Sequence, residues 1–156
     1  MPGDPSPLGT TLLPARILLS ATALFGAIGP FGADWNETHI YNPRWPPHAK
    51  FHNGQTMSTG VGLGLLTAYF AWRRTHTETM SGAMDNLLIA TLLSSLYWVT
   101  QLSAILYPGT DWCDEEFRHL GTPQKKGAPV LLGAGWVAFG LGWWRGFGFG
   151  QHGKVL

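Results

Sequence analysis

The sequence contains little charge. Only 12% of its 156 residues are Asp, Glu, Lys or Arg, whereas soluble domains usually carry about 25%. The ten basic residues are scattered along the chain and the formal net charge is +1. The chain therefore lacks the clustered basic surface that nucleic-acid-binding proteins present to phosphates, and we expect no nucleic-acid partner.

Cysteine is also scarce, since Cys113 is the only one. One cysteine excludes an internal disulfide and a paired-cysteine redox centre. The sequence also has no arrangement typical of a serine triad and no phosphate-binding loop. Its Gly-x-Gly run at Gly60 lies inside an apolar segment, where it has no phosphate to hold.

Apolar segments, by contrast, are abundant. Eight tryptophans and 21 glycines are typical of membrane proteins, in which Trp gathers at the interfaces and Gly is tolerated within helices. We predict an all-α integral membrane four-helix bundle, formed as one domain by residues 1–156 and surrounded by a lipid bilayer. The expected spans are residues 12–31, 57–72, 86–107 and 128–144.

Two polar loops, Trp35–Gln55 and Asp111–Lys126, separate these segments. Four spans would bring both loops to the same membrane face. The lysines and arginines divide equally between the two faces, so the positive-inside rule does not choose an orientation for this multi-pass protein. In a eukaryotic cell an endomembrane such as the endoplasmic reticulum is favoured.

The first loop leads into a second helix, which we expect to begin near Pro47, because proline suits the first helical position. One face of this helix is polar, and we expect it to turn toward the bundle while Ala49 and Asn53 point elsewhere. The spacing i, i+4, i+7, i+11 places on that face His48, His52, Gln55 and Thr59. Further along, Gly60 and Gly64 form a small-xxx-small pair that favours close approach of another helix.

The third helix carries a similar polar stripe. Its members, at i, i+3, i+4 and i+7, are Ser94, Tyr97, Trp98 and Gln101. Polar side chains within a span normally face the bundle interior, so two stripes beneath two polar loops predict a pocket opening at that face. The alternative is that these side chains only bond one another or backbone carbonyls between helices.

The simplest chemistry for such a pocket is acid–base catalysis. We expect His48 and His52 to be the proton-handling pair, because imidazole titrates near neutral pH. Their catalytic partners would be Glu37, His39 and Glu116. The pocket wall would combine both stripes with Trp35, Asn42 and Trp45, and the tryptophan faces could stabilise a developing cation. The alternative for the tryptophans is interfacial anchoring.

A metal site is the second interpretation, although we assign no cofactor. The ligands of a divalent metal would be His48, His52, Glu116 and His119, and imidazole with carboxylate suits iron, zinc or copper. Glu116 and His119 form Glu-x-x-His, but a di-metal bundle needs two such motifs and the chain has one.

The run WNETHIYNPRWPPHAKFH (residues 35–52), preceded by a Gly-Pro-Phe helix end, resembles the signature of a small four-helix integral membrane family without assigned chemistry. Some members of that family occur among secondary-metabolism genes. The resemblance implies membrane placement and the importance of Trp35, His39, Asn42, Pro43, Trp45, His48 and His52. In architecture alone, the chain is also similar to emopamil-binding (sterol isomerase) and DoxX-like membrane proteins.

Three functional hypotheses follow. The first is a membrane-embedded enzyme that acts on a small lipophilic substrate by isomerisation, cyclisation or hydrolysis. The second is a metal-dependent membrane oxidoreductase that uses the same histidines. The third is a non-catalytic protein that carries a ligand or steadies a partner membrane enzyme, and a homo-oligomer is compatible with each of the three.

Overall fold

Four long helices make up most of the protein in this computed structural model, which describes residues 7–74 and 79–148. They are α1 (Pro7–Asp34), α2 (Pro47–Trp72), α3 (Met80–Ser103) and α4 (Gln124–Phe147), joined after α3 by two short 3-10 helices, η1 (Ala104–Leu106) and η2 (Glu115–Leu120). No strand occurs within the described ranges. The all-α prediction is therefore confirmed.

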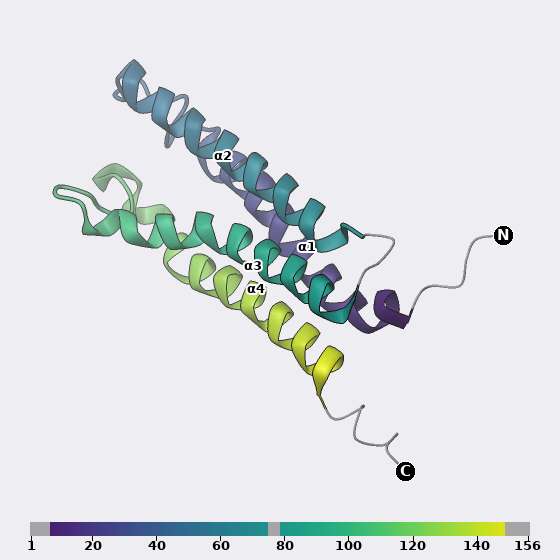
Figure 1. Cartoon of the computed structure of the whole chain (residues 1–156). Helices are drawn as coiled ribbons and strands as arrows, with labels where there is room; N and C mark the ends of the chain where they lie inside the picture. Colours follow the sequence, from purple (N-terminus) through teal and green to yellow (C-terminus); the bar gives the residue numbers. More distant parts are fainter. Residues whose placement is uncertain (1–6, 75–78, 149–156) are drawn as a thin grey trace, which may run out of the picture.

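The loops gather at one end of the bundle. In Figure 1 the α1–α2 and α3–α4 connections lie together at the left. The beginning of α1, the end of α2, the beginning of α3 and the end of α4 lie at the opposite end. This arrangement matches the convergence that the alternating helices predict.

Several helix ends differ from the expected spans. Helix α2 begins at Pro47 as predicted, after an extended Pro46. Helix α3 begins at Met80, earlier than the expected 86, because the Thr79 hydroxyl accepts a hydrogen bond from the backbone N–H of Gly82 at 3.1 Å. A hydroxyl that satisfies a free N–H of the first turn stabilises a helix start. Residues 80–85 thus belong to the helix and not to a connection.

Helices α1 and α2 approach each other closely at Gly60 and Gly64. A Cβ atom added to Gly60 would lie 2.5 Å from the carbonyl oxygen of Gly26, and one added to Gly64 would lie 2.7 Å from that of Ala23. Both distances are far below van der Waals contact, so only glycine permits this separation of the backbones. The small-xxx-small prediction is confirmed.

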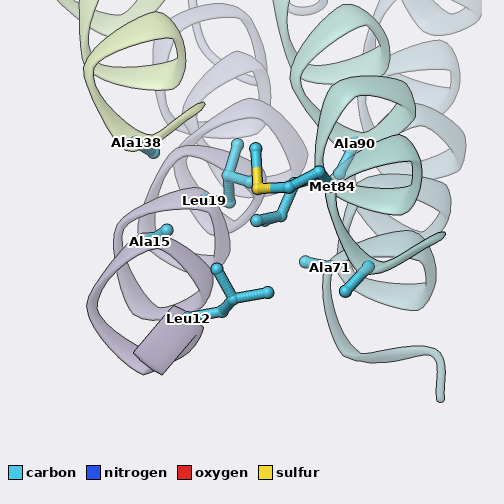
Figure 2. Packing of buried hydrophobic residues seen from close by; sticks show 9 residues of the cluster. Leu12, Ala15, Leu19, Ala71, Met84, Ala90 and Ala138 are labelled. Carbon is cyan, nitrogen blue, oxygen red and sulfur yellow. The ribbon is translucent and has the colours of Figure 1, made fainter. Parts of the chain in front are cut away.

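An apolar cluster closes the bundle at the end away from the loops (Figure 2). All four helices contribute, through Leu12, Ala15, Leu19, Ala71, Ala83, Met84, Leu87, Ala90 and Ala138. The Arg145 side chain at the end of α4 donates a hydrogen bond to the carbonyl of Thr11 at 2.9 Å, which ties α4 to α1. Arg16 is 1% exposed at this end of α1, which places its charge inside the bundle rather than on the outer surface.

Within the part of the chain that the structure describes, three helices are long and apolar enough to cross a membrane: Leu8–Asp34, Met80–Leu106 and Gln124–Phe147. Helix α2 is not among them, although it has 26 residues. Its first half carries His48, Lys50 and His52, and the apolar part that remains is shorter than the roughly 20 residues of a usual span. A spanning role for α2 therefore stays a prediction.

Candidate functional site

The first loop begins with a compact turn at the end of α1. The Asn36 amide donates to the carbonyl of Ala33 at 2.8 Å, and its oxygen accepts from the N–H and the hydroxyl of Thr38 at 2.8 and 2.6 Å. Asn36 thereby satisfies backbone groups that the end of a helix leaves free. The turn fixes the direction in which the rest of the loop leaves the bundle.

Side chains of the two loops bond to each other directly. The indole N–H of Trp45 donates to Asp114 at 2.9 Å, and the Asn42 amide donates to Glu116 at 3.4 Å. The Arg44 guanidinium forms an ion pair with the same Glu116 carboxylate. The predicted convergence of the loops is therefore realised by specific contacts.

A pocket of about 320 Å³ opens between these contacts. Its lining residues are Asn42, Arg44, Trp45, Asp114, Glu115 and Glu116. The volume lies near the lower end of the roughly 300–1,000 Å³ that small-molecule sites occupy. Three carboxylates face one guanidinium there, so the pocket combines negative charge with one aromatic wall.

Asn42 is the buried anchor of this pocket, with 2% of its surface exposed. Its side-chain oxygen accepts from the backbone N–H of Arg44 at 2.9 Å while its amide holds Glu116. Buried polar groups are stable only when bonded, and both ends of this amide are. Asn42 therefore fixes the position of Glu116 relative to the first loop.

His39 lies behind the aromatic wall. Its ring meets the Trp45 ring edge-on at 4.8 Å between centroids, and its Nδ1 lies 2.6 Å from the Thr38 hydroxyl. Its Nε2 is 3.8 Å from a carboxylate oxygen of Asp34, whose other oxygen accepts from the Asn53 amide at 2.8 Å. An imidazole oriented by a carboxylate is a common arrangement for proton transfer.

Asp34 is a residue that the sequence reasoning missed. It is the last residue of α1, and it connects that helix to Asn53 of α2 and to His39 of the loop. Its position in the sequence could have indicated this role. An aspartate at the end of an apolar helix needs a polar partner or water for its charge.

The polar stripe of α2 faces the wrong way for the predicted role. His48, His52 and Gln55 do share a face, with Nε2 atoms of the two histidines 3.1 Å apart and His52 Nδ1 3.3 Å from Gln55. That face is exposed, and so is Thr59, whereas Asn53 is buried. The expectation that the stripe turns toward the bundle, with Asn53 elsewhere, is therefore wrong.

The reason lies in the glycine pair of the same helix. At about 100° per residue, Gly60 and Gly64 share a face with the other buried positions, Asn53, Met57, Thr67 and Ala71. The histidine stripe lies roughly 130° around the helix from that face. Close packing of glycine against α1 thus turns the histidines outward.

The stripe of α3 does face inward, as predicted. Ser94, Tyr97 and Trp98 are buried, and Gln101 is partly buried. The interior beside them is filled, since the gap lined by Ser94 and Tyr97 measures only about 10 Å³, roughly the space of one water molecule. Ser94 donates to the carbonyl of Thr91 in its own helix at 3.1 Å, so this stripe does not extend the loop pocket.

Two other predicted residues lie apart from the pocket. Trp35 is 52% exposed, stacks on Phe31 at 5.8 Å between centroids, and donates to the Tyr41 hydroxyl at 2.5 Å. Glu37 is exposed. Of the predicted site residues, Asn42, Trp45 and Glu116 line the pocket and His39 adjoins it.

The second loop is braced by its own contacts. The pKa of Asp111 is held below its usual value, mainly because the backbone N–H of Trp112 donates to its carboxylate. The Arg118 guanidinium, 3.2 Å from the same carboxylate, adds to this effect. The Gln124 amide donates to the carbonyl of Trp112, and the Lys125 ammonium lies 5.5 Å from the centre of the Trp112 ring. These contacts fix the loop that carries the pocket carboxylates.

The four residues of the metal hypothesis do not form one centre. Glu116 is engaged by Arg44 and Asn42, while His119 Nδ1 lies 2.9 Å from the carbonyl of Glu116 and the other two histidines lie on α2. In residues 7–74 and 79–148, no three His, Cys, Asp or Glu side chains are grouped to hold a metal ion.

Residues 18–143 match the family of unknown function DUF6640. The chain belongs to this family. The matched range includes both loops and most of all four helices, and the family carries no assigned chemistry, in agreement with the resemblance drawn from the sequence. No curated protein and no solved structure matches the chain. The architectural likeness to emopamil-binding and DoxX-like proteins stays a prediction.

Proposed function

We propose that this protein is a membrane-embedded enzyme that binds a small lipophilic substrate at the loop pocket and transforms it by acid–base chemistry, such as isomerisation, cyclisation or hydrolysis. The observation that carries the proposal is the pocket itself, about 320 Å³ in volume and lined by three carboxylates, an arginine and a tryptophan. It lies at one end of helices that are otherwise apolar. A polar group of an amphiphile would enter the pocket while its apolar part stays beside the helices.

Two groups are suited to move protons in this pocket. Glu116 lines the pocket and is positioned by Arg44 and Asn42, so its carboxylate would act as the base. His39, paired with Asp34 and packed on Trp45, would return or relay the proton at the rim. The outward position of His48 and His52 removes them from this role.

A non-catalytic ligand carrier is the second candidate. The ion pair between Arg44 and Glu116 favours it, because a carboxylate held by a guanidinium loses basicity and then serves recognition better than proton transfer. The two candidates predict the same bound ligand, and they differ in whether that ligand is changed.

Mass spectrometry of a lipid extract separates them. We expect that the purified protein in lipid nanodiscs, incubated with an extract of its own host's membranes, consumes one amphiphile over time and produces an isomer or a hydrolysis product. Empty nanodiscs are the control. Retention of an unchanged compound would support the carrier, and neither retention nor conversion would contradict both candidates.

The proposal also requires a membrane placement with both loops on one side. In a Cys113→Ser background, we expect an impermeant maleimide to label Glu37→Cys and Leu120→Cys from the same side of sealed vesicles. Arg74→Cys, at the other end of the bundle, is the matched control and should react only from the opposite side. All three positions are exposed. Labelling of the two loops from opposite sides would contradict the placement.

A further inference from the structure

The exposed histidine pair on α2 has a geometry of its own, apart from the loop pocket. His48 and His52 stand on successive turns, and their Nε2 atoms are 3.1 Å apart. The two rings meet edge-to-face with centroids 4.5 Å apart. The two Nε2 atoms are therefore within hydrogen-bonding distance of each other, on the exposed side of the helix.

Gln55 contacts Nδ1 of His52, the ring nitrogen that is not near His48. Its side-chain oxygen lies 3.3 Å from His52 Nδ1, and an amide oxygen only accepts hydrogen bonds. A proton on Nδ1 of neutral His52 would satisfy this contact, and the Nε2 lone pair would then be free to accept from His48 or to bind a metal ion. Metal-binding histidines are commonly oriented in this way, by a polar group on the ring nitrogen that does not bind the metal.

Phe51 holds the two rings in place. It lies parallel to His48, with an interplanar angle of 4° and centroids 6.2 Å apart, and it meets His52 edge-on at 5.5 Å. The nearest lysine in the sequence, Lys50, projects from roughly the opposite side of the helix at about 100° per residue. No positive side chain of this turn therefore shares the histidine face.

The separation of the two nitrogens suits one metal ion. Two imidazole nitrogens, each 2.0–2.1 Å from a tetrahedral zinc, lie about 3.3 Å apart, close to the 3.1 Å observed. We propose that His48 and His52 form a two-histidine site for an imidazole-preferring transition-metal ion such as Cu²⁺ or Zn²⁺. Water completes the coordination, and the site is independent of the proposed acid–base function.

Copper is the sharpest probe, because it binds nitrogen sites most strongly among the divalent first-row metals. We expect the purified full-length protein in detergent to bind one Cu²⁺ with a paramagnetic resonance spectrum showing two nitrogen ligands. His48→Ala and His52→Ala should each lose this signal. Circular dichroism should stay unchanged, since both side chains are exposed.

A variant that keeps the number of histidines is the matched control. His52→Ala combined with Thr56→His moves the second imidazole to about 12 Å from His48 along the helix, beyond the reach of one ion. It should fail to restore the two-nitrogen signal. Persistence of that signal in either alanine variant, or in the shifted variant, would overturn the proposal.

Discussion

Replacing Glu116 with glutamine is expected to slow turnover about 10²–10⁴-fold, the usual effect of removing a proton-transfer group. Glutamine has the same shape and can still accept the hydrogen bond from Asn42, but it cannot take a proton from the substrate or pair with Arg44. Because the Arg44 side chain is well exposed, water can solvate it in the variant. The measurement is the rate of substrate loss in nanodiscs at saturating substrate.

Glu115→Gln is the matched control for this variant. Glu115 lines the same pocket, but the bonds to Arg44 and Asn42 belong to its neighbour. It should retain most of the activity while losing the same formal charge. Equal losses in both variants would mean that the pocket uses its overall negative charge, and full activity of Glu116→Gln would remove Glu116 from the mechanism.

Gly60→Ala is expected to destabilise the bundle by about 1–3 kcal/mol, the usual range for overpacking a close contact. The added methyl would lie 2.5 Å from the carbonyl oxygen of Gly26 and 3.3 Å from the Pro30 ring. A backbone carbonyl cannot swing away as a flexible side chain can, so α1 and α2 must separate. Chemical unfolding in detergent, followed by circular dichroism, measures the change in the free energy of unfolding.

Gly62→Ala tests whether the effect is local. Gly62 is exposed on the same helix, and a Cβ atom there meets nothing within 4 Å. Alanine favours the helical conformation over glycine by about 1 kcal/mol, so this variant should be as stable as the parent or more so. If Gly60→Ala were equally stable, the close approach of the two helices would not matter for folding.

The two polar stripes show how far periodicity predicts this fold. Both follow helical spacing, and the one containing Ser94 and Tyr97 does face inward. On α2 the sequence offered two candidate inner faces, the histidines and the pair Gly60 and Gly64, and spacing alone does not rank them. Close backbone contact decided in favour of the glycines, because a polar face can be left outside whereas a glycine face gains only from packing.

The location of the site could be predicted from the sequence, but the contacts between its residues could not. Alternation of helices puts both loops at one end, which is why Asn42, Trp45 and Glu116 were found from the sequence. The partners of these residues depend on the path of each loop. Turns such as the one at Asn36 determine that Trp45 bonds to Asp114 and that Asp34 meets His39. Helical periodicity does not describe such turns.

The two loops that form the pocket are synthesised at different times. Asn42 and Glu116 are 74 positions apart in the chain, and Trp45 and Asp114 are 69 apart. While the ribosome is still adding α3, the first loop is already made, yet none of its pocket partners exists. The nascent chain therefore carries Asn42 and Arg44 without Glu116 until the second loop emerges, so the pocket is complete only after that loop has been made.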